Sequence, residues 1–285
     1  MYSAAPWRGM KEGESMADAP NLGKRLVHRV DGMERVAIRR DIPYWQDGGV
    51  KLLMDVYAPA ELPSGFRLPA LFFVHGGPIP AEMLSPRRWG VFESYGALAA
   101  ASGLVGVTFD HRLHDPGDYT RAQDDVRTAI GYVREHADEL RVNPERIGIW
   151  VFSGGGPLLS WALRERPSYV GCLVAFYALL DLRHVTPPNA DPAVLERAKA
   201  LSPAAQLEGW LAGSPMFIAR AGRDSATINQ SIDLFIREAL TVNMQLDVAN
   251  HPEGEHAFDA RNDDDRSREI ITRAIAFVQA RLSRR

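Results

Sequence analysis

Six short apolar runs, separated by segments with helical character, set the strongest limit on how this chain can fold. The runs cover residues 70–74, 104–109, 147–152, 170–176, 216–221 and 245–249. Apolar strands that alternate with helices are typical of a parallel sheet built from right-handed crossovers. Residues 119–139 and 269–282 have the apolar spacing of amphipathic helices. We therefore predict an α/β fold with a mostly parallel central sheet and helices on both faces.

A hairpin is expected before this alternation begins. Residues 36–42 and 51–57 are β-like runs, and the segment between them contains the turn-like sequence Gln-Asp-Gly-Gly at residues 46–49. Two strands joined by a short turn pair antiparallel. The hairpin is therefore predicted to lie at one edge of the sheet.

Two segments fall outside this regular pattern. Residues 182–213 contain a proline-rich stretch and a short helical piece between two strand runs, which predicts a small lid over the carboxyl ends of the strands. Residues 1–30 are rich in glycine, alanine, serine and charge without apolar periodicity, which predicts a mobile leader. Residues 31–285 are then expected to form a single domain that carries the lid.

Composition narrows the class of protein. Hydrophobic residues make up 46% and charged residues 24% of the 285 residues, which is typical of a globular protein with a sizeable core. The net charge is −3 and the basic residues are scattered, which disfavours nucleic acid as a partner. No apolar run approaches the roughly 18 residues of a membrane span, and the start lacks a signal-peptide core, so we expect a cytoplasmic protein. The single cysteine, Cys172, excludes an internal disulfide and a CxxC zinc site.

The main chemical signal is a serine at the end of a strand run. Ser153 follows the 147–152 run and precedes Gly154, Gly155 and Gly156. A sharp strand-to-helix turn lifts a serine hydroxyl above a sheet, and it needs small neighbours because the serine backbone is strained. Here the chain resembles the α/β-hydrolase family, in its carboxylesterase, dienelactone-hydrolase and prolyl-oligopeptidase-like branches. The family's nucleophile elbow is GxSxG, and this chain has VFSGG, with Val151 in place of the first glycine.

A glycine pair after the 70–74 run extends the resemblance. His75, Gly76 and Gly77 match the family's HGG-type oxyanion loop, which implies that Gly76, Gly77 and Gly154 supply backbone N–H donors. Pro78 stands where some esterases have a further glycine and cannot donate. His75 is interpreted as a structural residue that anchors the loop.

Two later loops complete the constellation. Asp224 lies in a Gly-x-Asp turn and His256 in a Gly-x-His-x-Phe segment, each after a strand run and in the family's contexts. The resemblance implies a catalytic triad of Ser153, Asp224 and His256, in the chain order of this fold. Asp181 is a weaker alternative acid, and His251 is interpreted as a surface or loop-packing residue.

The resemblance implies a serine esterase that cleaves small-molecule esters and needs no metal or organic cofactor. Small to medium acyl chains are expected because the predicted lid is short and the region beside the expected pocket has apolar residues such as Phe176, Tyr177, Leu179 and Leu180. Residues 110–113 resemble the family's Asp-x-Arg-Leu stretch and are expected to support the oxyanion loop. Two alternatives stay open: an amidase or peptidase related to the prolyl-oligopeptidase group, and a non-catalytic ligand-binding protein of the same fold. The oligomeric state is also open, with a homodimer among the options.

Overall fold

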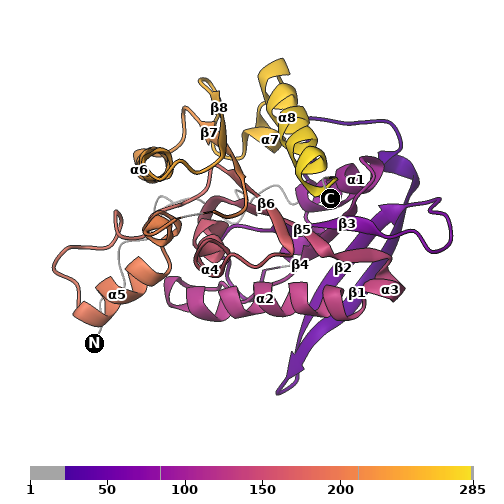
Figure 1. Cartoon of the computed structure of the whole chain (residues 1–285), viewed down its shortest axis with the longest axis horizontal. Coiled ribbons are helices and arrows are strands. Elements are labelled where there is room, and N and C mark those ends of the chain that lie inside the picture. The colour runs from indigo at the N-terminus through magenta and orange to yellow at the C-terminus, as the bar shows by residue number, and fades with distance from the viewer. Residues whose placement is uncertain (1–22, 84, 211, 284–285) are drawn as a thin grey trace.

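The computed structural model describes residues 23–83, 85–210 and 212–283, which form one eight-stranded mixed sheet (Figure 1). The strand order is β1-β2-β4-β3-β5-β6-β7-β8. The strands are β1 (Val36–Asp47), β2 (Val50–Pro59), β3 (Leu68–Val74), β4 (Val105–Phe109), β5 (Val142–Phe152), β6 (Val170–Phe176), β7 (Met216–Ala221) and β8 (Leu246–His251). β1 and β2 form the predicted antiparallel edge hairpin, and β3 to β8 are parallel.

Helices cover both faces of the sheet, as predicted. The α-helices are α1 (Gly90–Ala101), α2 (Tyr119–Glu135), α3 (Ala137–Leu140), α4 (Ser160–Glu165), α5 (Pro192–Ala200), α6 (Ala226–Thr241), α7 (Phe258–Arg261) and α8 (Asp265–Leu282). The 3-10 helices are η2 (Met33–Arg35), η3 (Pro86–Arg88), η4 (Pro116–Asp118), η5 (Ser153–Leu159) and η6 (Pro203–Leu207). Helices α1 and α8 enclose one core, and α2, α4 and α6 enclose the other. None of the helices within the described ranges has both the length and the hydropathy for a membrane crossing.

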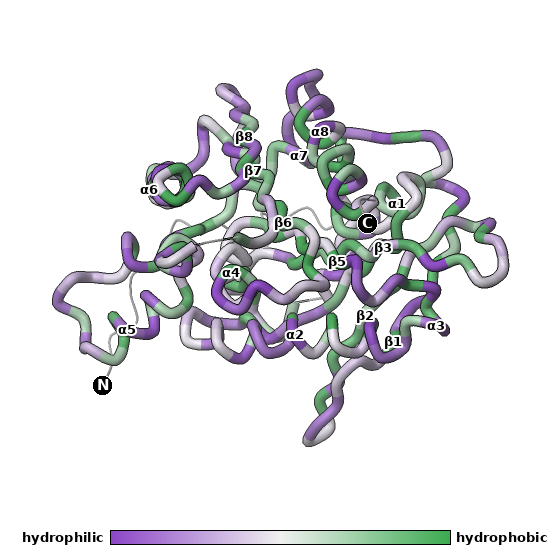
Figure 2. Tube along the Cα trace, in the orientation of Figure 1, coloured by the Kyte–Doolittle hydropathy of each residue, from purple (hydrophilic) through white to green (hydrophobic). Residues whose placement is uncertain are grey.

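The central strands are apolar on both sides because each side faces a core. In β5, Ile149 and Val151 point into the core of α2, whereas Trp150 and Phe152 point into the core of α1 and α8. Successive side chains of a strand point to opposite faces, so a strand buried on both faces is apolar without interruption. Figure 2 shows hydrophobic positions along these strands and hydrophilic ones on the outer turns of α2.

Some boundaries differ from the sequence analysis. The helix expected over residues 119–139 divides at His136 into α2 and α3. Most of the predicted leader, residues 1–22, lies outside the described residues. The remainder packs on the domain: Leu26 is buried, and the Val27 N–H donates to the carbonyl of Asp259. Residues 23–30 therefore do not behave as the leader assignment expected.

The predicted lid segment leaves the carboxyl end of β6 and returns to the start of β7. It carries α5 and η6, and η6 packs against α4 and α6, whereas α5 lies at the outer end of the molecule (Figure 1). Its start is tied down by Ser202, whose hydroxyl accepts the N–H of Leu182. Among the described residues, no hydrogen bond joins this segment to Ser153, and its role as a lid stays a prediction.

A buried arginine ties the edge hairpin to the centre of the sheet. Arg87 of η3 is 3% exposed, and its guanidinium bonds to Asp41 of β1, Asp55 of β2 and Asp110 after β4. The Arg87 Nη1 to Asp110 Oδ2 distance is 2.7 Å. A buried guanidinium is stable only when carboxylates pair with it from several directions. One side chain therefore joins three segments next to the loop that follows β3.

We expect Arg87→Leu to lower the free energy of unfolding by about 3–5 kcal/mol, because it removes the buried guanidinium that pairs with Asp55 and Asp110. The matched control is Arg88→Leu, since the Arg88 side chain also pairs with Asp41 but is 41% exposed. The control should lose less than about 1 kcal/mol. Urea denaturation measures both, and equal losses would show that the buried network carries no special stability.

Candidate active site

The serine predicted as nucleophile stands on a strained turn at the carboxyl end of β5. Ser153 is the first residue of η5 and has a φ of 51°, in the left-handed region. Few non-glycine residues adopt this conformation, and it persists only where the surroundings enforce it. The elbow predicted from the sequence is therefore present in its backbone geometry.

The glycines after Ser153 are required by close contact with the loop after β3. A Cβ at Gly154 would lie 1.8 Å from the carbonyl oxygen of Gly77, and a Cβ at Gly155 would lie 2.7 Å from that of His75. Real Cβ atoms do not approach backbone oxygens so closely. The elbow and the predicted oxyanion loop thus touch through their backbones.

Val151, which replaces the family's first elbow glycine, does not prevent this geometry. Its side chain is fully buried in the core under α2, together with Ile147 and Ile149 of the same strand. Ser153 keeps its left-handed backbone with the valine in place. Val151 therefore contributes to the core on the side opposite to Phe152.

The predicted oxyanion donors surround the serine. A Cβ at Gly76 would lie 2.8 Å from the Cβ of Ser153 and 3.4 Å from its Oγ, so Gly76 lies directly against the predicted nucleophile. Within the described residues, neither Gly76 N–H nor Gly77 N–H donates a hydrogen bond. Gly154 is the second residue of η5, where a helical N–H has no partner within the helix. These three N–H groups are available to a substrate oxygen.

Two buried histidines hold the oxyanion loop. The rings of His75 and His111 stack with centroids 3.6 Å apart. His111 Nε2 donates to the His75 carbonyl at 3.1 Å, and His75 Nδ1 donates to the Gly76 carbonyl at 2.7 Å. In a trans peptide the carbonyl and the following N–H point in opposite directions. Each histidine therefore turns the N–H of Gly76 or Gly77 away from itself.

Burial favours the neutral form of both histidines. Burial lowers the pKa of His75 to about 4. Burial, followed by the neighbouring ring of His75, lowers the pKa of His111 well below its usual value. The sequence predicts His75 as the anchor of the loop but does not single out His111. The only sequence signal for His111 is its place in residues 110–113, the stretch expected to support that loop.

The predicted acid and base meet at the carboxyl ends of β7 and β8. His256 Nδ1 donates to Asp224 Oδ2 at 2.7 Å, while Asp224 Oδ1 accepts the N–H of Ser225 at 2.7 Å. The Asp224 side chain is 4% exposed and that of His256 is 39% exposed. A carboxylate on Nδ1 leaves Nε2 without a proton and able to accept one. The ring of Tyr177 packs edge-on against His256, with centroids 4.9 Å apart.

The structure shows no hydrogen bond between the Ser153 hydroxyl and His256, which both lie in the described part of the chain. Among the described residues, neither the Ser153 hydroxyl nor His256 Nε2 makes a hydrogen bond with a side chain. In substrate-free enzymes this bond is often long and tightens when substrate binds. The structure thus joins Asp224 to His256 and Ser153 to the oxyanion loop, and the last link of the triad stays a prediction.

The alternative acid and base are occupied elsewhere. Asp181 forms a bidentate pair with Arg183 at 2.9 and 2.7 Å. Burial opposes ionisation of Asp181, but Arg183 outweighs it and the pKa of the carboxyl is lowered. His251 is 3% exposed, and its Nε2 faces Asp264 and Ser267. Of the two expectations for His251, the packing role is therefore confirmed, and a position at the surface is wrong.

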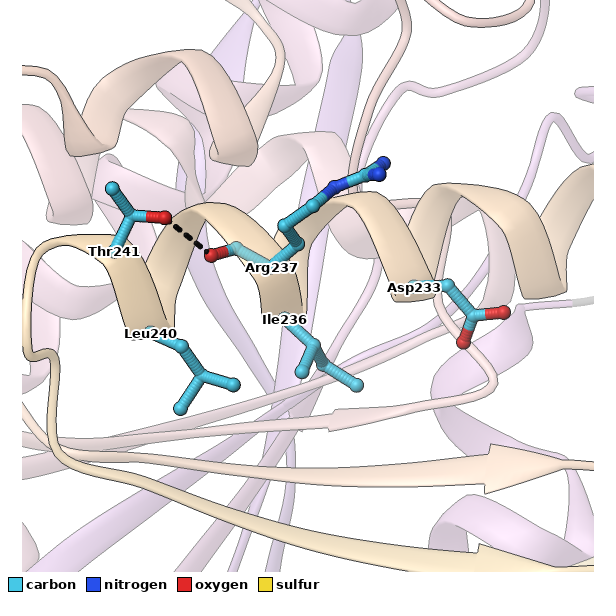
Figure 3. Close-up of a pocket in the computed structure, with 5 residues that line it drawn as sticks. All are labelled: Asp233, Ile236, Arg237, Leu240 and Thr241. Atoms are coloured by element: carbon cyan, nitrogen blue, oxygen red, sulfur yellow. Dashed lines mark hydrogen bonds between the residues drawn. The ribbon is translucent and has the colours of Figure 1, made fainter.

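A surface hollow lies apart from this constellation. It is lined by residues of α6 alone, namely Asp233, Ile236, Arg237, Leu240 and Thr241 (Figure 3). Ile236 and Leu240 project to the same side of the helix, and Leu240 is 61% exposed. It contains none of the predicted site residues. Among the residues with assigned positions, no group of histidine, cysteine or acidic side chains is arranged to hold a metal ion.

Family models match most of the chain. The model of the dienelactone hydrolase family matches residues 110–278, which is more than half of the 285 residues and includes Ser153, Asp224 and His256. The model described as BD-FAE matches residues 54–165, which include the oxyanion loop and the elbow. The two matches overlap at the elbow.

Several curated relatives and solved structures are similar. Acylcarnitine hydrolase of Rattus norvegicus is 26% identical over 164 residues, 54% of this chain and 28% of that protein. Carboxylesterase 3 of Homo sapiens is 25% identical over 170 residues, 56% of this chain and 28% of that protein. The chain thus spans less than a third of the length of these curated relatives. An esterase of Thermogutta terrifontis with bound propionate has a TM-score of 0.71 at 22% identity, covering 89% of this chain and 97% of that chain. The predicted α/β-hydrolase fold is confirmed.

We expect His111→Phe to make the free energy of unfolding depend less steeply on pH in acid. The pKa values of His75 and His111 are lower in the folded protein than in the unfolded chain, so the unfolded chain binds protons first. Their stabilisation is complete above about pH 6.5, and that of His75 is lost as the pH falls towards about 4. That of His111 is lost as the pH falls well below 6.5. Each histidine adds a slope of at most about 1.4 kcal/mol per pH unit. Urea denaturation over this range measures the slope, and an unchanged slope in His111→Phe would show that His111 is not held neutral.

Proposed function

This chain belongs to the dienelactone hydrolase family, and we propose that it hydrolyses carboxylic esters, with Ser153 as nucleophile, His256 as general base and Asp224 as the acid of the triad. The observation that supports this most is the 2.7 Å hydrogen bond from His256 Nδ1 to Asp224, and the left-handed backbone of Ser153 is the second. That bond selects the tautomer whose Nε2 accepts a proton.

The reaction has two halves. His256 takes the proton of the Ser153 hydroxyl as its oxygen bonds to the acyl carbon, and the imidazolium then gives that proton to the departing alcohol. Water repeats the sequence on the acyl-serine, with His256 again as base, and the carboxylic acid leaves. Asp224 stabilises the imidazolium in both halves and stays ionised.

The backbone at the serine supplies the electrostatic stabilisation. The carbonyl oxygen of the ester becomes negative in each tetrahedral intermediate, and the N–H groups of Gly77 and Gly154 are proposed to donate to it, with Gly76 as a further donor. Donors that are already oriented need no rearrangement when the charge develops. The stacked histidines His75 and His111 hold the two peptide planes from behind.

Small to medium acyl chains are the proposed substrates. Structures of the Thermogutta terrifontis esterase were solved with butyrate and with propionate bound. In this chain, residues 182–213 are proposed to act as a lid that limits the acyl group. Their anchor is close to the elbow, because the N–H of Leu179, just before them, donates to the Ser153 carbonyl at 2.9 Å.

Labelling with a fluorophosphonate tests the nucleophile without a guess about substrate. Trypsin releases residues 147–164 as one peptide, and fragment spectra distinguish Ser153 from Ser160 within it. We expect the label on Ser153 in the wild type and in Ser160→Ala, and no label in Ser153→Ala or His256→Ala. A label on another peptide would contradict the assignment of Ser153.

Turnover of p-nitrophenyl esters from acetate to decanoate then tests the substrate class. We expect kcat/KM to be highest for the short and medium chains and to fall by about 10⁴-fold or more in Ser153→Ala. Activity should also fall in acid, because only neutral imidazole accepts the serine proton. Faster cleavage of matched anilides than of esters would favour an amidase, and loss of neither activity in Ser153→Ala would contradict the mechanism.

A further inference from the structure

A second carboxylate is buried behind the catalytic dyad. Asp259 of α7 is fully buried, three residues after His256. Its Oδ1 accepts the phenol of Tyr177 at 2.8 Å, and its Oδ2 accepts the phenol of Tyr95 at 2.5 Å. Both oxygens are thus bonded by donors, which favours the ionised carboxylate in a buried place. Burial acts in the opposite direction and raises the pKa of Asp259, whereas the hydrogen bonds from Tyr95 and Tyr177 lower it. The mechanism above does not use this residue.

Tyr177 connects this carboxylate to the histidine. One edge of its ring faces the imidazole of His256 at a centroid distance of 4.9 Å, while its hydroxyl bonds to Asp259. Tyr95 bonds to the same carboxylate from α1, but its ring packs on Phe73, Trp150 and Phe152 instead of the histidine. Both tyrosines therefore donate to Asp259, and of the two it is Tyr177 that also packs against His256.

The backbone between His256 and Asp259 needs such an anchor. Ala257 has a φ of 62° and Tyr177 a φ of 39°, both in the region that L-residues rarely adopt. Strained residues persist only where several contacts fix the chain on either side. Asp259 supplies these contacts. Its side chain bonds to Tyr177 just after β6 and to Tyr95 of α1, and its carbonyl accepts the N–H of Val27.

From these contacts we propose that Asp259 is a positioning residue for His256. Asp259 holds the imidazole through Tyr177, and its negative charge makes that imidazole more basic. This deepens the proposed esterase function and rests on it for the role of His256. Asp224 and Asp259 then act from two sides, Asp224 by a direct hydrogen bond and Asp259 through its field and its packing.

The charges around the two groups support the sign of this effect. Asp224 after β7 and Tyr177 after β6 contact His256, and Asp259 of α7 bonds to Tyr177 and to Tyr95 of α1. The charge of His256 acts on Asp259 and lowers the pKa of that carboxyl. Burial, and then the charge of Asp259, raises the pKa of Tyr177 well above its usual range, so its phenol stays neutral and donates. Arg261 is the cation whose charge acts on Tyr177. The field of Asp259 therefore stabilises an imidazolium at His256.

Titration of His256 by NMR tests the charge without any assay of ester cleavage. Histidine labelled with ¹³C at Cε1 alone gives one ring signal for each of the 8 histidines, and the signal missing in His256→Gln belongs to His256. In Asp259→Asn we expect the midpoint of His256 to move to lower pH by about 0.5–1 unit, since a negative charge near the imidazole is removed. Asp259→Glu, which keeps the charge, should restore most of the midpoint.

The matched control is Asp264→Asn, which removes a carboxylate bonded to His251 instead. It should leave the His256 midpoint where it is. A midpoint in Asp259→Asn equal to that of the wild type would overturn the electrostatic part of the proposal. Because this readout needs no turnover, its failure is distinguishable from a failure of Ser153 to label.

The positioning part is tested by milder variants that also serve if Asp259→Asn does not fold. Tyr177→Phe and Tyr95→Phe each remove one phenol from the same carboxylate. We expect Tyr177→Phe to lower kcat by about 10-fold with little change in KM, because small displacements of a catalytic group are costly. Tyr95→Phe should lower it by less than about 3-fold. Equal effects on kcat would mean that Asp259 acts on the stability of the fold alone and would overturn the proposal.

Discussion

Backbone contact between two loops is the constraint on which the site depends. The carbonyls of His75 and Gly77 press against the Cα atoms of Gly155 and Gly154, at distances that leave no room for a side chain. This contact is possible because β3 and β5 are hydrogen-bonded neighbours in the sheet and end at the same level. The serine and its expected oxyanion donors therefore belong to one packed unit, and neither loop could move without the other.

The titratable groups around this unit differ in how deeply they are buried. His75 and His111 lie where burial favours the neutral imidazole, and each donates one N–H to a carbonyl of the loop. His256 lies at the surface with Asp224 beneath it. His75 and His111 thus differ from His256 in burial and in the groups to which they bond, and residue type alone does not separate them.

Much of the fold could be predicted from the pattern of residues. Strands β6 and β7 have the predicted bounds, because a strand buried on both faces is apolar along its whole length and ends where that run ends. The helix over 119–139 was predicted too long, since apolar periodicity continues across the break at His136. The leader was drawn too long at its end, because Leu26 becomes a core residue only where α1 and α8 enclose it.

The sequence by itself determined the parallel sheet, the edge hairpin, and the serine, aspartate and histidine in the order of an α/β-hydrolase. Local spacing and local turn chemistry carry that information. Only the tertiary structure decided that Tyr95, Tyr177 and Asp259 meet, that Arg87 gathers three carboxylates and that His111 stacks on His75. Tyr95 and Asp259 are 164 residues apart along the chain. Contacts of this kind follow from which strands become neighbours, and they leave no periodic trace in the residues that make them.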